Sequence, residues 1–473
     1  MAQLFDFGLV GLGVMGRNFL LNVADHHFSA IGLDTDAQKV ADLKDEGHSD
    51  DIEGTLDKVE FIKKLARPRK IMLLVPAGGP VDHVITDLLP LLDSGDLIID
   101  GGNSHFEDTN RRFTSLKSKD IHFMGSGVSG GSEGARMGPS IMPGGDSKAY
   151  EIIKPIFEAV AAKVNNEPCV DFMGKGSAGN YVKMIHNGIE YALMQLIGES
   201  YHIMKLGLQQ DNHSLKQTYD DWNQGVLQSF LVEITSQIFN KKDDLTSGDL
   251  LDQILDKAKQ KGTGKWTSQN AMDLGVAIPT IDAAVSMRQI SGMKDIRMKA
   301  SEKYTEGSGE FTPEVSVEEV RDALYFAFIM SYAQGMDQLR RASKEYQYDL
   351  NLESIAKIWR GGCIIRARFL EDIRLAYKND SSLESLLLSP VISEKVNSVV
   401  GATRKVIQYT VAKGIPTLAL SNALNYFDAF KSAYLPLNLI QAQRDLFGSH
   451  TYERKDKPGI FHSDWNQSDY LLK

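Results

Sequence analysis

Short apolar runs alternate with amphipathic stretches along the first 170 or so residues, and each run ends in a glycine-rich or polar turn. The runs lie at 5–11, 28–34, 70–76, 96–102 and 121–127. This alternation is typical of a parallel sheet whose strands are buried on both faces by helices. We therefore expect an α/β domain over residues 1–176, with its binding site at the carboxyl ends of the strands.

Helical periodicity replaces this pattern after residue 177 and continues to about residue 435. Two segments, 192–225 and 327–362, resemble each other: each runs from a helix through a connector to Trp-x-x-Gly before another helix. We expect a large all-α domain over 177–435 that contains an internal duplication. The polar, irregular segment 436–473 is predicted to be a tail that folds only by docking on something.

Composition limits the functional classes. The chain has 473 residues, 42% of them hydrophobic and 24% charged, with a net charge of -10. This acidic balance disfavours nucleic acid and anionic membranes as partners. No apolar run approaches the roughly 18 residues of a membrane span, and the N-terminus carries Asp6 and lacks the basic segment of a signal peptide. The two cysteines, Cys169 and Cys363, suggest neither a disulfide framework nor a metal site, so we expect a cytoplasmic, metal-free protein.

A glycine-rich loop supplies the first candidate chemistry. Gly11, Gly13 and Gly16 have G-x-G-x-x-G spacing, directly after an apolar run and before an amphipathic stretch. Gly11 would allow the tight turn, Gly13 the close approach of a pyrophosphate, and Gly16 the packing of helix on strand. A plain structural turn is the alternative, but the context is that of a Rossmann-like dinucleotide site.

The residue that ends the second apolar run bears on cofactor choice. Asp34 lies 23 positions after Gly11, where a carboxylate accepts hydrogen bonds from the adenosine ribose and repels a 2′-phosphate. Thr35 and Asp36 follow it, and only Lys39 offers a positive charge nearby. These residues alone favour NAD over NADP.

A polar stripe interrupts an otherwise apolar helix at 181–191. At 100° per residue, Lys183, Asn187 and Glu190 fall within about 60° of one another, and His186 lies about 60° from Lys183. A solvated helix face is the bland explanation. The surrounding apolar residues favour instead a buried pocket that holds a base and an acid about two turns apart.

Taken together, these motifs resemble the 6-phosphogluconate dehydrogenases, the decarboxylating enzymes of the pentose phosphate pathway, over essentially the whole chain. The segments that carry the resemblance lie at 11–16, 98–112, 124–145, 182–191, 260–271 and 442–454. The resemblance implies oxidation of the 3-hydroxyl of 6-phospho-D-gluconate with hydride transfer to NADP, loss of CO2, and protonation of the enediol to D-ribulose 5-phosphate. A carboxylate β to a ketone can leave without a metal.

The resemblance also implies roles for single residues. Lys183 would be the general base and acid, and Glu190 the proton donor to the enediol. The implied cofactor-binding residues are Gly11, Leu12, Gly13, Val14, Met15, Gly16, Asp34, Thr35, Asp36, Val75, Pro76, Ala77 and Asn103. The implied substrate-binding residues are Asn103, Ser129, Gly130, Gly131, His186, Asn187, Tyr191, Lys261, Arg288, Arg444 and His450. Arg444 and His450 would reach the active site of the partner subunit, so a homodimer is expected.

The sequence departs from the family at the cofactor. NADP-using members typically carry Asn-Arg-Thr or Asn-Arg-Ser where this chain has Asp34, Thr35 and Asp36, and Pro76 stands where Lys is usual. The family implies NADP, whereas these residues favour NAD.

Two other functions remain open. Another β-hydroxyacid dehydrogenase would share the glycine loop and the lysine but lack the long duplicated helical domain. A non-catalytic dinucleotide-binding protein would have no reason to keep Lys183, Glu190 and Asn103 in these positions.

Overall fold

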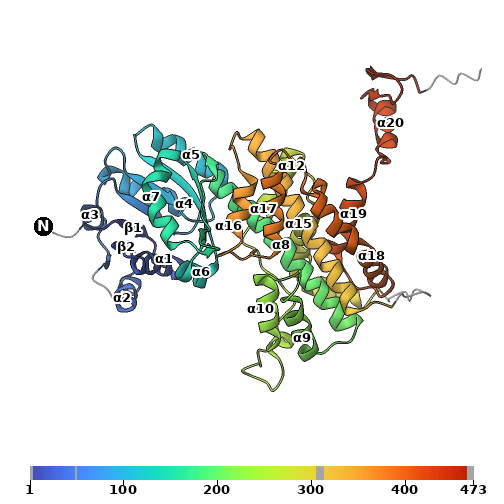
Figure 1. Cartoon of the computed structure of the whole chain (residues 1–473), viewed down its shortest axis with the longest axis horizontal. Helices are drawn as coiled ribbons and strands as arrows, with labels where there is room; N and C mark the ends of the chain where they lie inside the picture. Colours follow the sequence, from blue (N-terminus) through green and yellow to red (C-terminus); the bar gives the residue numbers. More distant parts are fainter. Residues whose placement is uncertain (1–3, 48–50, 305–313, 466–473) are drawn as a thin grey trace, which may run out of the picture. The chain divides into compact units, whose positions relative to one another are not determined.

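A computed structural model gives the structure, and it describes residues 4–47, 51–304 and 314–465. The chain forms two compact units, Met1–Leu424 and Asn425–Lys473 (Figure 1). Residues 466–473 of the predicted tail lie outside the described residues.

In the described residues, eight strands of the first unit form one sheet in the order β10-β7-β6-β5-β4-β1-β2-β3. All neighbours are parallel except β6 and β7, which are antiparallel. The strands are β1 (Phe7–Val10), β2 (Ala30–Leu33), β3 (Ile52–Thr55), β4 (Lys70–Leu73), β5 (Leu97–Asp100), β6 (His122–Ser129), β7 (Ser140–Gly145) and β10 (Gly174–Lys175). The predicted α/β class is confirmed, and each predicted apolar run contains a strand.

Helices cover both faces of this sheet. Alternate strand residues point to opposite faces, so Leu9 joins the core under α1 and α7, whereas Val10 joins the core under α3, α4 and α5. The helices are α1 (Val14–Asp25), α2 (Ala37–Glu46), α3 (Lys58–Lys63), α4 (Gly79–Leu88), α5 (Phe106–Lys117), α6 (Gly131–Met137) and α7 (Ser147–Val160). A 3-10 turn (η1, Leu89–Leu91) follows α4, and β8 (Lys163–Val164) with β9 (Glu167–Pro168) forms a short hairpin.

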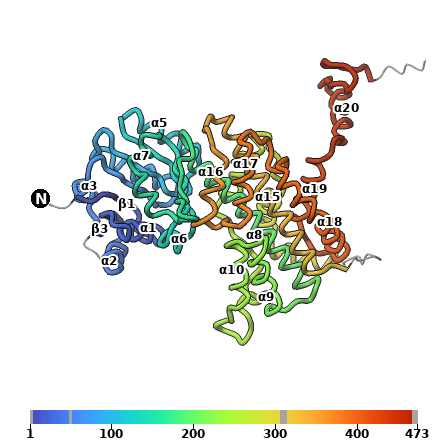
Figure 2. Tube along the Cα trace, in the orientation of Figure 1, coloured from blue at the N-terminus to red at the C-terminus, as the bar shows by residue number. Residues whose placement is uncertain are grey.

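The rest of the first unit is helical, as the periodicity predicts. Its helices are α8 (Ala178–His202), α9 (Asn212–Trp222), α10 (Phe230–Phe239), α11 (Leu250–Gln253), α12 (Thr263–Leu274), α13 (Pro279–Gly292), α14 (Lys294–Ser301), α15 (Val317–Glu345), α16 (Leu352–Trp359), α17 (Phe369–Asn379) and α18 (Pro390–Ala412), with short turns η2 (Ile203–Gly207) and η3 (Leu386–Leu388). The next helix, α19 (Leu418–Phe430), begins in the first unit and ends in the second. The long helices α8 and α15 pack against each other in the centre of this bundle (Figure 2). Helix α8 also packs on β6 and β7, which brings it to the sheet.

The two similar sequence segments have the same order of elements. Helices α8, α9 and α10 correspond to α15, α16 and α17, and the second and third helices of each set pack together. Trp222 ends α9 and Trp359 ends α16, and Gly225 and Gly362 follow at the same spacing. This order supports the predicted duplication.

A cavity of about 800 Å³ opens where the end of the first repeat meets the start of α15. Trp222 and Gly225 line it from the first repeat. Its lining from α15 includes Glu318, Arg321, Asp322 and Tyr325.

The second unit contains α20 (Leu437–Gly448) and a hairpin of β11 (Tyr452–Glu453) with β12 (Ile460–Phe461). The buried carboxylate of Asp445 holds these parts together, since it accepts hydrogen bonds from the Thr451 N–H (2.8 Å), the Ser463 N–H (3.1 Å) and the Trp465 indole (2.8 Å). Large apolar side chains remain exposed on α20: Leu437, Leu439, Ile440, Leu446 and Phe447.

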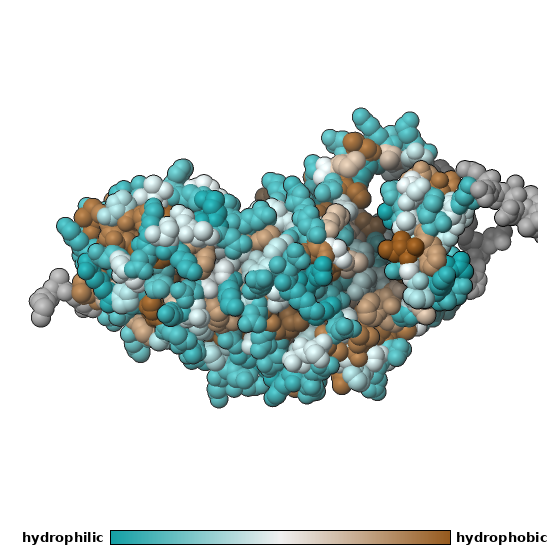
Figure 3. Space-filling view, turned by 90° about the horizontal axis from the view of Figure 1, so that it is seen from above, coloured by the Kyte–Doolittle hydropathy of each residue, from teal (hydrophilic) through white to brown (hydrophobic). Residues whose placement is uncertain are grey.

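The face of the molecule in Figure 3 is mainly hydrophilic, and hydrophobic residues gather there only in smaller patches. Within the described ranges, no helix is both long and apolar enough to cross a membrane.

Candidate active site

The glycine-rich loop shapes the start of α1. Gly11 has φ +100°, and a Cβ there would lie 2.6 Å from the carbonyl oxygen of Leu74. A Cβ on Gly16 would lie 1.9 Å from the carbonyl oxygen of Gly11, so only glycine allows this helix to approach the turn. No atom lies within 4 Å of the place of a Cβ on Gly13. The loop is thus closed on its inner side and open at Gly13.

The N-terminus of α1 is free to bind an anion. Asp36 caps α2 and Asp57 caps α3 with their carboxylates, whereas Gly13 leaves the first N–H groups of α1 without a side-chain cap. Such N–H groups, together with the helix dipole, favour a phosphate. The open side of the loop and this helix end fit the pyrophosphate of a dinucleotide.

A cavity of about 870 Å³ lies beside the loop. Gly11, Gly13, Asp34, Thr35, Val75 and Pro76 from the predicted cofactor set line it. Its other lining residues include Leu56, Asp57, Lys58 and Asp87, which the sequence analysis missed. Leu56, Asp57 and Lys58 follow β3, whose short sequence Ile-Glu-Gly-Thr carries little strand signal, and Asp87 lies on α4. The cavity is large enough for a ligand of cofactor size.

Asp34 lies at the end of β2 on the floor of this cavity, and it is 9% exposed. Its carboxylate accepts the Leu12 N–H at 2.7 Å and the Asp36 N–H at 3.0 Å. Lys39 Nζ lies 3.6 Å from Asp34 and 3.9 Å from Asp36, and Lys58 lies 3.4 Å from Asp87. Both lysines of the cavity are therefore close to carboxylates.

The polar stripe lies on α8, in the interior of the first unit. Lys183 is 6% exposed and His186 is fully buried, whereas the Glu190 side chain is 22% exposed. His186 Nδ1 lies 3.4 Å from Lys183 Nζ, 3.1 Å from Asn187 Oδ1 and 3.8 Å from Glu190 Oε2. The four side chains form one buried polar cluster, so the solvated-face alternative is excluded.

Burial shifts the protonation of this cluster. It lowers the pKa of Lys183 from its usual value, although the carboxylate of Glu190 opposes the shift. It raises the pKa of Glu190, although Lys183 and Arg288 oppose that shift. Burial and the neighbouring Lys183 also hold the pKa of His186 well below its usual value. The cluster thus favours a neutral amine, a neutral imidazole and a protonated carboxyl more than water does.

The β6–α6 loop and the second helical repeat close this cluster on one side. Ser129 Oγ lies 3.2 Å from His186 Nε2, and the Trp359 ring packs edge-on against the imidazole with 5.6 Å between centroids. Gly130 has φ +119°, and a Cβ there would lie 2.7 Å from the carbonyl oxygen of Gly362. In the sequence, Trp359 and Gly362 are recognisable only as the Trp-x-x-Gly of the second similar segment. No sequence signal places them beside the site.

Three of the predicted substrate-binding residues lie together beyond Glu190 on α8 and its neighbours. The guanidinium of Arg288 lies 4.8 Å from the centre of the Tyr191 ring. The backbone N–H of Lys261 donates to the Tyr191 hydroxyl at 3.4 Å. Asn103 is exposed in the turn that follows β5.

The last two predicted substrate-binding residues lie in the second unit. There Arg444 donates to Gln441 at 3.0 Å, and His450 packs edge-on against Phe447.

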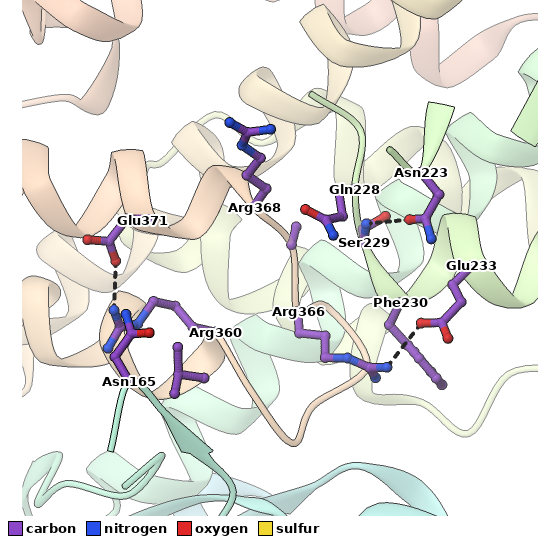
Figure 4. Close-up of a pocket in the computed structure, with 12 residues that line it drawn as sticks. Asn165, Asn223, Gln228, Ser229, Phe230, Glu233, Arg360, Arg366, Arg368 and Glu371 are labelled. Carbon is purple, nitrogen blue, oxygen red and sulfur yellow. Dashed lines mark hydrogen bonds and ion pairs between the residues drawn. The ribbon is translucent and has the colours of Figure 1, made fainter. Parts of the chain in front are cut away.

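Another cavity, of about 480 Å³, carries three arginines but does not resemble an anion site (Figure 4). The guanidiniums of Arg360, Arg366 and Arg368 point away from one another in this view. Arg360 donates to Glu371 at 2.7 Å, and Arg366 donates to Glu233 at 3.2 Å. The ion pairs here join the helices around the cavity.

The doubly wound sheet, the glycine loop and the cavity at the strand ends define a protein of the Rossmann-like, dinucleotide-binding class. Comparison with known proteins then identifies the family. Residues 6–174 match the NAD binding domain of 6-phosphogluconate dehydrogenase, and residues 179–465 match the 6-phosphogluconate dehydrogenase C-terminal domain. The chain belongs to the 6-phosphogluconate dehydrogenase family, as the motifs predict.

Individual relatives are similar along their whole length. A Bacillus subtilis protein named "6-phosphogluconate dehydrogenase, NADP(+)-dependent, decarboxylating" is 50% identical, over 97% of this chain and 99% of its own. A decarboxylating 6-phosphogluconate dehydrogenase of Lactococcus lactis is 48% identical, over 98% and 99%. The solved 6-phosphogluconate dehydrogenase of Plasmodium falciparum, studied with NADP+ and with 6-phosphogluconate, is 44% identical with a TM-score of 0.94, over 97% of this chain and 100% of its own.

Proposed function

We propose that this protein oxidises 6-phospho-D-gluconate and decarboxylates the product to D-ribulose 5-phosphate and CO2, without a metal. The observation that carries the proposal is the buried cluster of Lys183, His186, Asn187 and Glu190 on α8, beside a cavity that fits a dinucleotide. The names of the relatives support the same reaction. Two alternatives were open: another β-hydroxyacid dehydrogenase and a non-catalytic dinucleotide-binding protein. Neither accounts for the group formed by Tyr191, Lys261 and Arg288 next to the α8 cluster.

Lys183 and Glu190 divide the proton transfers. The bound dinucleotide supplies the hydride acceptor. Neutral Lys183 takes the proton of the 3-hydroxyl as the carbonyl forms, and returns it to that oxygen when CO2 leaves. Protonated Glu190 then donates to C1 of the enediol. Both protonation states are those that burial favours.

The remaining side chains hold the substrate. Ser129, Gly130, Gly131, His186 and Asn187 bind its carboxylate and hydroxyl groups, and Tyr191, Lys261 and Arg288 bind its phosphate. Asn103 lies between the substrate and the nicotinamide. A neutral His186 can orient substrate without adding a second cation beside Lys183.

The rate should depend on pH through these two groups. Activity requires neutral Lys183, so kcat rises as pH increases through the lysine pKa, which burial lowers. Activity also requires protonated Glu190, so kcat falls as pH increases through the carboxyl pKa, which burial raises. We expect a bell-shaped profile of kcat against pH. In Glu190→Gln the residual activity should lose its alkaline limb, and an unchanged limb would remove Glu190 from the proton-donor role.

We also propose that this enzyme prefers NAD or at least tolerates it well, although relatives bind NADP. Asp34 lies where a 2′-phosphate would approach, and Lys39 and Lys58 lie near carboxylates. The side-by-side measurement is kcat/KM for 6-phosphogluconate oxidation at 340 nm with each cofactor. An NADP preference above about tenfold, or 1.4 kcal/mol, would contradict this proposal.

The double variant Asp34→Asn/Thr35→Arg should shift the ratio toward NADP by about tenfold or more, because it removes a like charge and adds a bidentate phosphate ligand. Lys39→Ala is the control. If this variant lowers only the NADP activity, Lys39 reaches the 2′-phosphate and Asp34 does not set the choice.

We propose a homodimer in which Arg444 and His450 complete the partner's active site. The exposed apolar side chains of α20 support docking of the second unit on another surface. The three-part division into residues 1–176, 177–435 and 436–473 and the cytoplasmic location stay predictions.

A further inference from the structure

Arg112, on α5, forms hydrogen bonds with two loops that carry predicted cofactor-binding residues, but with none of those residues themselves. Its side chain is 2% exposed. The guanidinium Nε donates to Asp82 at 2.8 Å, and Nη2 donates to Asp82 at 3.1 Å and to the carbonyl oxygen of Gly78 at 3.0 Å. Nη1 donates to Asp100 at 3.1 Å and to the Ser104 hydroxyl at 3.2 Å. All five N–H donors of the guanidinium are thus used.

These acceptors belong to two different loops at the carboxyl edge of the sheet. Gly78 and Asp82 lie in the turn after β4 and in the first turn of α4, directly after Val75, Pro76 and Ala77. Asp100 ends β5, and Ser104 follows Asn103. One side chain therefore joins two loops that carry proposed cofactor-binding residues: Val75, Pro76 and Ala77 in the first, and Asn103 in the second.

The second loop is held further from inside. Asp100 is fully buried, and it accepts the Ser104 hydroxyl at 2.7 Å and the Gly102 N–H at 3.1 Å. Asn180, near the start of α8, donates to the carbonyl oxygen of Gly102 at 3.2 Å. Asn103 thus lies between neighbours that are fixed by Arg112 and by the helix that carries Lys183.

We propose that Arg112 is a positioning residue for cofactor binding, which clamps the 75–79 and 100–104 loops at the separation that the bound cofactor requires. Lysine cannot replace it, because an ammonium has three donors on a point charge and cannot reach five acceptors in a planar fork. This inference rests on the proposed function, since Val75, Pro76, Ala77 and Asn103 are its cofactor-binding residues.

The experiment compares Arg112→Lys with its neighbour Arg111→Lys in the full-length enzyme. Arg111 pairs with the same Asp82, at 2.9 Å, but its side chain is 56% exposed and bridges no cofactor loop. We expect Arg112→Lys to raise the cofactor Kd, measured by NADH and NADPH fluorescence, and the cofactor KM by about tenfold. The KM for 6-phosphogluconate should change little, and Arg111→Lys should stay within about twofold in both KM values and in the cofactor Kd.

If Arg112→Lys does not fold, Asp82→Asn tests the positioning role of Arg112 instead. The Asp82 side chain is 34% exposed, so the amide is tolerated in the fold while the charge-assisted bonds to Arg112 weaken. A rise in cofactor KM without a rise in substrate KM supports the clamp. An unchanged cofactor KM, or equal rises in both KM values, overturns it. Failure of the proposed function is distinct, because the wild-type enzyme itself would then give no absorbance at 340 nm.

Discussion

Lys183→Met should lower kcat for 6-phosphogluconate oxidation by about 10³-fold, within the range of roughly 10²–10⁴ that general acid–base catalysis contributes. Methionine keeps the length and apolar stem of the side chain in a site that is 6% exposed, but it cannot take the hydroxyl proton. Because the lysine lies on α8 and the cofactor cavity is lined by loops of the sheet, the Kd for the dinucleotide should change little.

Rapid mixing with single-turnover detection at 340 nm measures this effect on the hydride step itself. Lys175→Met is the matched control, since Lys175 is exposed just before α8, and its kcat should stay within about twofold. A Lys183→Met enzyme that keeps more than about a tenth of its kcat would assign the base to another group.

Mixing two inactive variants should restore activity if each active site is shared between subunits. Lys183→Met removes the base, and Arg444→Ala removes a phosphate ligand that we place in the partner's site. In a mixed dimer, one site carries both defects and the other carries neither. Random reassociation makes about half of the dimers mixed, so about a quarter of the wild-type activity should return.

The geometry of the second unit makes this experiment clean. Asp445 is buried and holds the loop after α20 by hydrogen bonds within the same unit, and Arg444 points to Gln441. Arg444→Ala therefore leaves that internal frame intact. Mixing Arg444→Ala with His450→Ala is the control. It should restore no activity, because both residues lie in the tail and every site of a mixed dimer still receives one altered tail. Activity from that control, or none from the first mixture, would contradict site sharing.

The sequence predicts the parts of the fold that short-range periodicity controls. The apolar runs place β1, β2, β4, β5 and β6 because strands buried on both faces are continuously hydrophobic. It misses β7, whose sequence Ser-Ile-Met-Pro-Gly-Gly reads as a turn because of Pro143 and two glycines. That strand pairs antiparallel with β6, so the predicted parallel sheet is mixed at this edge.

The candidate site divides in the same way. Lys183, His186 and Glu190 can be grouped from the sequence, because helical spacing alone brings them to one side of α8. Arg112 and Trp359 cannot, because only the packing of α5 and α16 against other elements gives them their neighbours. Asp57 and Lys58 line the cofactor cavity through a strand that the apolar pattern does not mark.

The two similar helical segments carry different side chains at corresponding positions. If the offset between residues 192 and 327 is extended toward the N-terminus, Lys183 corresponds to Glu318, His186 to Arg321, Asn187 to Asp322 and Glu190 to Tyr325. These four line the cavity beside Trp222, just as the polar cluster on α8 lies beside Trp359 through His186. Trp222 of the first repeat thus lies beside polar residues of the second, and Trp359 of the second repeat lies beside the cluster of the first. Because each pocket takes its tryptophan from the other repeat, a single copy of the unit would not form either pocket.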